Sequence, residues 1–277
     1  MEPVKVVPYD PKWPEMFALE AQLIKRVLKK NCTVVHHVGS TSIPGMAAKP
    51  KIDIIAVVKD SSTINSALES IGYLYKGEYN IPFHSGFSKR EPHISVNLHV
   101  YEEENPEIIL NLLFRDYLRS HIDAFEEYAH LKSHLIDQPS SHQRQGRFSG
   151  YNLGKDQFIK KTLKKAGFKE LCLRFCTHHD EWEAAQNFRQ HYFLTHLGIT
   201  DPYPPSFGPK DQIHFVFYQG TEIVGYAHIQ LLDTQKAKLN IFIIDDSHLG
   251  MGFEKHFLPL CKRWLDRQGL HLISNDS

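Results

Sequence analysis

One short segment gathers residue types that handle phosphate groups. It runs Val38-Gly-Ser-Thr-Ser-Ile-Pro-Gly45 and is followed by Lys49 and Asp53. Glycine lets the backbone approach a ligand, hydroxyl groups and amides donate to phosphate oxygens, and lysine adds a positive charge. On composition alone, a turn between strands with an exposed aspartate is favoured over a ligand site. The candidate phosphate ligands are Gly39, Ser40, Thr41, Ser42 and Lys49, and Asp53 is the candidate ligand of a divalent ion such as Mg²⁺.

A second pattern places two glycines where a helix begins. Gly250-Met-Gly252 lies between an apolar run and an amphipathic segment. The free amides and the dipole at the start of a helix attract anions. Two glycines before a helix are weak evidence alone, and a loop kept only for packing is the alternative.

Several other kinds of site are disfavoured. The 18 histidines show no H-E-x-x-H or similar metal spacing, and the four cysteines form no paired C-x-x-C motifs. Lys plus Arg and Asp plus Glu both number 32, so we expect no general nucleic-acid binding. The apolar runs are far shorter than the roughly 20 residues that cross a bilayer, and no secretory signal follows Met1. We therefore expect a cytoplasmic protein that does not enter membranes.

The length of 277 residues favours two cores of ordinary size. In the first part, the strand predicted at Ile52 to Val58 is apolar throughout, as a central strand buried on both faces would be. The other predicted elements of this part are a helix opened by Asp10 to Trp13, strands at Cys32 to Val38 and His93 to Tyr101, and helices at Ile108 to Leu118, Ile122 to Leu135 and Lys155 to Ala166.

The pattern begins again at Leu171. A hairpin is predicted around Gln219-Gly220-Thr221, and Thr200 to Pro209, with four prolines, is predicted as a rigid loop. The predicted strands are Leu171 to Cys176, Gln212 to Tyr218, Glu222 to Leu232, Ala237 to Ile244 and Leu270 to Ser274, with helices from Asp180 and after Gly252.

The first part resembles the GrpB family, which has the nucleotidyltransferase fold. The motifs that carry the resemblance are Val7-Pro-Tyr-Asp-Pro-Lys-Trp13, His37 to Gly45, Lys49-Pro to Asp53, Phe114-Arg-Asp-Tyr-Leu-Arg119, Tyr128-Ala-His-Leu-Lys132, and Tyr151 through Gly154-Lys155. The resemblance adds substrate-binding candidates at His99, Arg115, Arg119, Lys132, Tyr151 and Lys155. For Arg115 and Arg119, four residues apart on one helix face, a solvated surface beside Asp116 is an equal alternative.

The same resemblance makes Asp53 the candidate catalytic and metal residue. Working nucleotidyltransferases place two acidic residues one apart on this strand so that both ligate metal ions, but here the position two residues after Asp53 is Ile55. The GrpB family tends to show two histidines around a leucine on the later strand, where this chain has Asn97-Leu-His99. Binding of a phosphorylated ligand is therefore better supported than two-metal catalysis.

The second part resembles the GNAT acetyltransferases. In that family the strand that matches Ala237 to Ile244 contacts the pantetheine of acetyl-CoA, and the loop amides hold its pyrophosphate. The implied cofactor contacts are Ile243, Ile244, Leu249, Gly250, Met251 and Gly252. Where the family has Arg or Gln before the loop, this chain has Ser247. The family's later helix and strands, with a general-acid tyrosine, have no counterpart here.

These patterns predict an α/β protein with mixed sheets. Residues 1–168 form a GrpB-like nucleotidyltransferase-fold domain, and residues 169–277 form a GNAT-like domain truncated at its C-terminus. The leading function is an acetyl-CoA-dependent N-acyltransferase whose acceptor is selected by the first domain or by the loop Thr200 to Pro209. The alternatives are nucleotidyl or phosphoryl transfer at Asp53 and a non-catalytic module that binds phosphorylated ligands. An exposed final strand is a template for pairing, so we expect the first domain or a homodimer partner to cover it.

Overall fold

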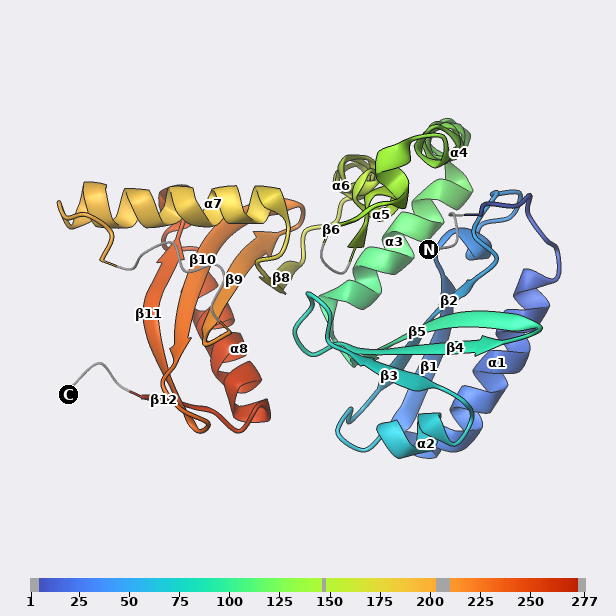
Figure 1. Ribbon diagram of the computed structural model, residues 1–277, viewed down its shortest axis with the longest axis horizontal. Coiled ribbons are helices and arrows are strands. Elements are labelled where there is room, and N and C mark those ends of the chain that lie inside the picture. Colours follow the sequence, from blue (N-terminus) through green and yellow to red (C-terminus); the bar gives the residue numbers. More distant parts are fainter. Residues whose placement is uncertain (1–4, 146–147, 203–209, 274–277) are drawn as a thin grey trace. The chain divides into compact units, whose positions relative to one another are not determined.

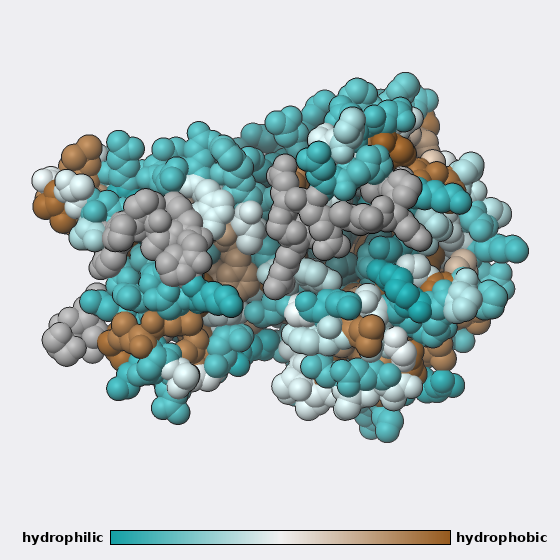
Figure 2. Space-filling view, viewed as in Figure 1, coloured by the Kyte–Doolittle hydropathy of each residue, from teal (hydrophilic) through white to brown (hydrophobic). Residues whose placement is uncertain are grey.

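The computed structural model describes residues 5–145, 148–202 and 210–273. Residue contacts divide the chain into two compact units, one of residues 1–79 and 83–168 and one of residues 80–82 and 169–277. Both are mixed α/β units, as the sequence predicts, and each contains a five-stranded mixed sheet (Figure 1). No helix in the described ranges has the length and apolar character needed to cross a bilayer. On the face drawn in Figure 2 most of the surface is hydrophilic, with interspersed apolar patches.

The N-terminal sheet has the strand order β1-β2-β5-β4-β3. Strands β2 and β5 are parallel, whereas the other neighbours are antiparallel. Six of the seven residues of β2 are buried, because the strand lies inside the sheet with neighbours on both edges. The strands are β1 (Cys32–Val38), β2 (Ile52–Val58), β3 (Leu74–Gly77), β4 (Ser85–Glu91) and β5 (Ile94–Glu102).

Two apolar clusters hold this unit together. One joins the sheet to α1 and α2 through buried side chains such as Ile24, Leu68 and Ile54. The other joins the segment after β1 to α3, α4 and α6 through Met46, Leu118 and Phe158. Figure 1 shows α3 to α6 gathered apart from α1 and α2. The helices are α1 (Trp13–Leu28), α2 (Asn65–Glu69), α3 (Pro106–Ser120), α4 (Ile122–Ile136), α5 (Gly150–Leu153) and α6 (Asp156–Lys165), with a two-residue pair of strands at β6 (Arg144–Gln145) and β7 (Phe148–Ser149).

The C-terminal sheet has the order β12-β11-β10-β9-β8. The pairs β8–β9, β9–β10 and β10–β11 are antiparallel, and β12 runs parallel to β11. Strand β12 pairs only with Lys236 to Lys238 of β11. From Leu239 to Ile244, the edge of β11 that faces away from β10 therefore pairs with no described strand. The strands are β8 (Leu171–Phe175), β9 (Gln212–Gln219), β10 (Glu222–Leu231), β11 (Lys236–Ile244) and β12 (His271–Ile273).

Helices α7 (His179–Gln190) and α8 (Phe253–Arg267) cover opposite faces of this sheet (Figure 1). Neighbouring residues of a strand point to opposite faces. In β9, His214 contacts Trp182 of α7, whereas Phe217 stacks on Phe257 of α8 with ring centres 4.5 Å apart. Helix α7 continues directly into η4 (His191–His196), a π-helical turn.

Several elements of the N-terminal unit have no counterpart in the sequence prediction: α2, β3 and β4, and the short elements β6, β7 and α5. Strand β4 reads Ser-Gly-Phe-Ser-Lys-Arg-Glu, yet Ser88 and Lys89 are buried. The Nζ of Lys89 lies 3.1 Å from Oε1 of Glu20 on α1, and both side chains are almost fully buried. A charge is tolerated inside this sheet because a carboxylate from a distant helix neutralises it.

Candidate functional site

Asp53 is the first polar side chain of β2 and lies beside Asn97 of β5 in the parallel register. The Nδ2 of Asn97 donates to Oδ1 of Asp53 at 2.8 Å, and Nη2 of Arg90 donates to Oδ1 of Asn97 at 2.8 Å. Gly39 packs on the other side of the carboxylate, with φ at 68°. Asp53 is thus a single carboxylate held by an amide, and a second carboxylate does not face it among the described contacts.

The two arginines predicted as ligands hold the backbone of the glycine-serine segment. Nη1 of Arg115 donates to the carbonyl of His37 at 2.9 Å, and Nη2 of Arg119 donates to the carbonyl of Ser42 at 2.6 Å. Arg115 also forms an ion pair with Asp116 at 2.7 Å. Both guanidinium groups therefore position the segment from helix α3.

The hydroxyl groups of this segment are partly engaged within the protein. The Oγ of Ser42 donates to the carbonyl of Gly39 at 2.6 Å, and Oγ1 of Thr41 donates to the carbonyl of Lys51. Thr41 and Ser42 are buried, whereas Ser40 is half-buried. Ser40 is consequently the hydroxyl of the three that a ligand reaches most easily.

Lysine side chains gather around Tyr151. The Nζ of Lys49 lies 4.2 Å from the centre of the Tyr151 ring, and the Nζ of Lys155 lies 4.8 Å from it. Burial, together with the charges of Lys155 and Lys51, lowers the pKa of Lys49 to about 8, although Asp53 opposes the shift. Among the described residues, the ammonium groups of Lys49 and Lys155 form no hydrogen bond or ion pair. This cation cluster is therefore not neutralised by the protein and suits an anionic ligand.

Lys132 belongs to the same region but is nearly inaccessible. Its side chain donates to the carbonyl of Ala47 and lies 4.8 Å from the centre of the Tyr128 ring. Burial, with a smaller effect of Lys155, lowers the pKa of Lys132 to about 7. Its role in the structure is to fix the chain between the glycine-serine segment and Lys49.

His99 contacts a second histidine that the sequence prediction missed. Nε2 of His84 and Nδ1 of His99 are 3.0 Å apart, and the two rings stack. Burial and the neighbouring His99 lower the pKa of His84 to about 3, and burial also lowers the pKa of His99. His84 immediately precedes β4, a strand that local sequence patterns did not indicate, and Arg90 beside Asn97 was missed for the same reason.

The C-terminal unit contains a cavity of about 760 Å³ between α7, η4 and one end of the sheet. Three of the predicted cofactor contacts, Ile243, Ile244 and Leu249, line it. The other described lining residues are Ala184, Asn187, Phe188, His191, Tyr192, His196, Ile223, Phe242, Asp245, Asp246 and Glu254. The cavity thus lies where β11 ends and the glycine loop begins.

The glycine loop leads from β11 to the first turn of α8. Gly250 and Gly252 both have φ of 80°, a conformation that favours glycine, and an added Cβ would meet nothing within 4 Å at either residue. Leu249 and Met251 are 58% and 60% exposed. Gly250, Met251 and Gly252 lie outside the cavity wall, and Asp245 and Asp246 supply negative charge upstream. Residues 203–209 of the predicted acceptor loop lie outside the described ranges.

Residues 3–165, more than half of the chain, match the GrpB protein family. The chain belongs to the GrpB family. The UPF0157 protein YqkA of Bacillus subtilis is 40% identical over 171 residues, which are 59% of this chain and 47% of YqkA. The UPF0157 protein BH1888 of Halalkalibacterium halodurans is 40% identical over 135 residues, which are 48% of this chain and 69% of BH1888. The chain therefore spans about half the length of one bacterial GrpB relative and two thirds of another.

A crystal structure of GrpB from Enterococcus faecalis matches with 36% identity and a TM-score of 0.51, covering 58% of this chain and 96% of that one. For the C-terminal part, the structural neighbours include a GNAT family acetyltransferase from Staphylococcus aureus, at 14% identity and a TM-score of 0.29 over 38% of this chain and 87% of that one. The ribosomal-protein-S18-alanine N-acetyltransferase of Escherichia coli matches at 17% identity and a TM-score of 0.30, over 39% of this chain and 70% of that one. The GrpB family predicted for the first part is thus confirmed, and the structural neighbours found for the second part include GNAT acetyltransferases.

Proposed function

We propose that this GrpB-family chain is an acetyl-CoA-dependent N-acyltransferase whose cofactor binds along β11 of the C-terminal unit. The observation that carries the proposal is the edge of β11 from Leu239 to Ile244, which has no described strand partner and ends beside a large cavity. Unpaired backbone groups at a strand edge bind extended chains that carry amides. The pantetheine arm of acetyl-CoA is such a chain.

The loop after β11 suits the diphosphate end of the same cofactor. Gly250, Met251 and Gly252 precede the first turn of α8, where backbone amides and the helix dipole favour an anion. When bound, acetyl-CoA would supply an acetyl thioester: a C–N bond to the acceptor amine would form as the C–S bond breaks, and coenzyme A would leave as the thiol with the proton that the amine loses. The chain's contribution is to hold the thioester in one orientation.

Calorimetry with acetyl-CoA on the full chain tests this proposal. We expect heat of binding below millimolar cofactor, and no heat at millimolar cofactor would overturn the proposal.

Met251 is exposed, so a charged residue in its place changes the charge of the loop without changing the core. Met251→Lys should strengthen binding and Met251→Glu should weaken it, because the diphosphate is anionic. Leu232→Lys, at an exposed site beyond β10, is the matched control and should leave affinity unchanged.

The N-terminal unit, we infer, binds a phosphorylated or nucleotide-like ligand. The un-neutralised ammonium groups of Lys49 and Lys155 beside Ser40 support this role. Pyrophosphate and ATP are suitable probes, and Lys49→Met and Lys155→Met should each weaken binding several-fold. Lys161→Met serves as the control, because Lys161 pairs with Glu127 on the surface. Equal affinity in all variants would contradict this site.

Nucleotidyl or phosphoryl transfer at Asp53 is the alternative activity of this site. It would use Mg²⁺ held by Asp53, but the cations Lys49, Lys51 and Arg90 around the carboxylate favour an anion over a metal ion. Incubation with labelled nucleotide and Mg²⁺ separates the two roles. Transfer that is abolished in Asp53→Asn supports catalysis, and binding without transfer supports a ligand-binding site alone.

A further inference from the structure

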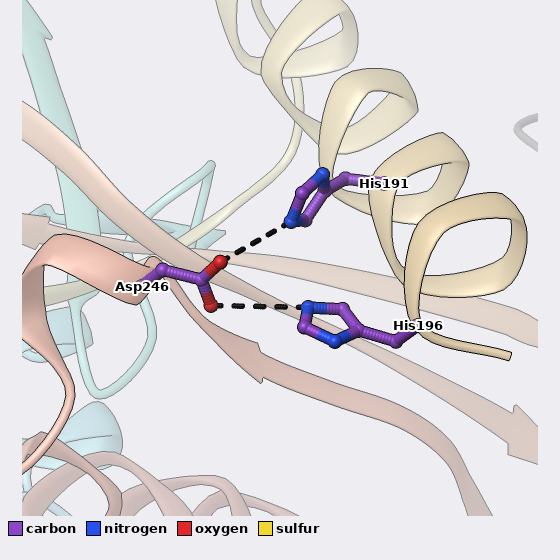
Figure 3. Close-up of side chains that lie close together, drawn as sticks. All are labelled: His191, His196 and Asp246. Carbon is purple, nitrogen blue, oxygen red and sulfur yellow. Dashed lines mark hydrogen bonds and ion pairs between the residues drawn. The ribbon is translucent and has the colours of Figure 1, made fainter.

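Three side chains of the C-terminal unit converge at the wall of the cavity: His191, His196 and Asp246 (Figure 3). Nε2 of His191 lies 3.3 Å from Oδ2 of Asp246, and Nε2 of His196 lies 3.8 Å from Oδ1. Each carboxylate oxygen thus faces a different imidazole, and one ligand atom from each residue lies within 4.8 Å of the other two. In the described part of the chain, no other group of three such side chains is placed in this way.

The backbone conformation of η4 creates this arrangement. His196 is five positions after His191, and in an α-helix that spacing turns two side chains about 140° apart. In the π-helical turn η4 the repeat is wider, and the two imidazole rings lie with their centres 4.9 Å apart. π-Helical turns are rare and are frequent at functional sites. The turn is therefore a second observation, independent of the residue types, that points to a ligand.

We propose that His191, His196 and Asp246 bind one divalent transition-metal ion, with Zn²⁺ as the reference ion. A tetrahedral ion with ligands about 2.1 Å away keeps neighbouring ligand atoms roughly 3.4 Å apart. The two nitrogen–oxygen distances of 3.3 and 3.8 Å are close to that spacing. Only small side-chain movements are needed to seat an ion between the three groups.

The donor set selects the class of metal. Two imidazole nitrogens and one carboxylate oxygen suit Zn²⁺, Co²⁺, Ni²⁺ or Cu²⁺, whereas Mg²⁺ prefers oxygen ligands. Three protein ligands leave at least one position open for water or for an oxygen donor of a small molecule. Because all three residues line the cavity, we place that open position toward it. This site is independent of the proposed acetyl-CoA binding and stands or falls separately.

Calorimetry with ZnCl₂ on the full, tag-free chain tests the site. We expect one ion per chain, bound at micromolar or tighter concentration. His191→Ala and His196→Ala should each weaken binding by roughly tenfold or more, because each removes a ligand. His179→Ala is the matched control: this exposed histidine also faces a carboxylate, that of Glu183 at 4.0 Å, but no third ligand, and its loss should leave the strong site intact.

Cobalt substitution gives a readout that does not depend on affinity. Co²⁺ bound by these ligands should show visible absorption bands of a low-coordinate site, and Asp246→Asn should shift or remove them. Circular dichroism of each variant checks folding, which we expect to be unchanged because the three side chains are about half exposed. Wild-type Zn²⁺ affinity and stoichiometry in a His191→Ala, His196→Ala double variant would overturn the proposal, as would a wild-type chain that binds no Zn²⁺ at micromolar concentrations.

Discussion

Gly39 and Asp53 pack so closely that a Cβ on Gly39 would lie 2.5 Å from Oδ2 of the Asp53 carboxylate. Gly39 also has φ of 68° and ψ of −175°, a backbone conformation that is nearly exclusive to glycine. We expect Gly39→Ala to destabilise the N-terminal unit by about 2–4 kcal/mol, from backbone strain and the steric clash together. Urea unfolding, with hydrogen exchange of peptides from this unit, measures the change.

Gly167→Ala is the control for this prediction. Gly167 follows α6 with φ of 78°, but an added Cβ there meets nothing within 4 Å. Its substitution should cost only the strain of a left-handed residue, about 1 kcal/mol. Equal losses in the two variants would show that contact with Asp53 contributes nothing.

Lys132 should make the stability of the N-terminal unit depend on pH. Its pKa is about 7 in the folded unit and returns to the ordinary value of 10.5 on unfolding. Between these values the unfolded chain holds a proton that the folded chain has released, so the free energy of unfolding should rise from pH 7 toward pH 10. Lys132→Met should reduce this slope, and Lys30→Met, at an exposed position, should not. Urea unfolding of each variant at pH 6.5 and pH 9.5 measures how much its free energy of unfolding changes with pH. An equal change in the wild type and Lys132→Met would contradict the prediction.

The buried pair of Glu20 and Lys89 should respond asymmetrically to substitution. Glu20→Leu alone leaves the ammonium of Lys89 inside the unit with only Glu91, at 3.5 Å, to balance it. We expect that variant to lose about 3–5 kcal/mol, whereas the double variant Glu20→Leu, Lys89→Met should recover most of the loss. A double-mutant cycle in urea measures the coupling. Additive losses would contradict the prediction.

Gly225 of β10 should not tolerate a side chain. A Cβ there would lie 2.5 Å from the carbonyl oxygen of Ile243 and 2.7 Å from Cδ2 of Phe217. We expect Gly225→Ala to destabilise the C-terminal unit by about 1–3 kcal/mol through overpacking. Lys236→Ala, at an exposed position on β11, should stay within about 0.5 kcal/mol of the wild type. Thermal unfolding followed by tryptophan fluorescence compares the two.

Local sequence patterns predicted the strands whose burial follows from their own residues. Cys32–Val38 and Ile52–Val58 have the predicted bounds, because apolar runs between loop residues define both. Strand β4 was missed because Lys89 depends on Glu20, which lies 69 residues away in sequence. When a charged side chain is buried because of a partner that is distant in sequence, the local hydrophobic periodicity does not indicate a strand.

The residues of the candidate sites also fall into two groups: those predicted from the local sequence and those that only the folded structure brings to the site. The motif residues around Asp53 and the end of β11 were found from their types and order. Arg90 of β4 and His84, which directly precedes β4, complete the first region because β4 pairs with β5. His191, His196 and Asp246 were missed because histidine spacing was tested against α-helical and loop patterns. A five-residue spacing brings two side chains together only in the π-helical turn, which the sequence did not predict.

The lowered pKa of Lys49, beside the Tyr151 ring, has a consequence for the reactivity of its amine. With a pKa of about 8, about half of the Lys49 side chains carry a free lone pair at that pH. A lysine with the ordinary value of 10.5 is almost entirely protonated under the same conditions. At pH 8, electrophiles such as anhydrides or activated esters should therefore modify Lys49 ahead of the chain's solvated lysines.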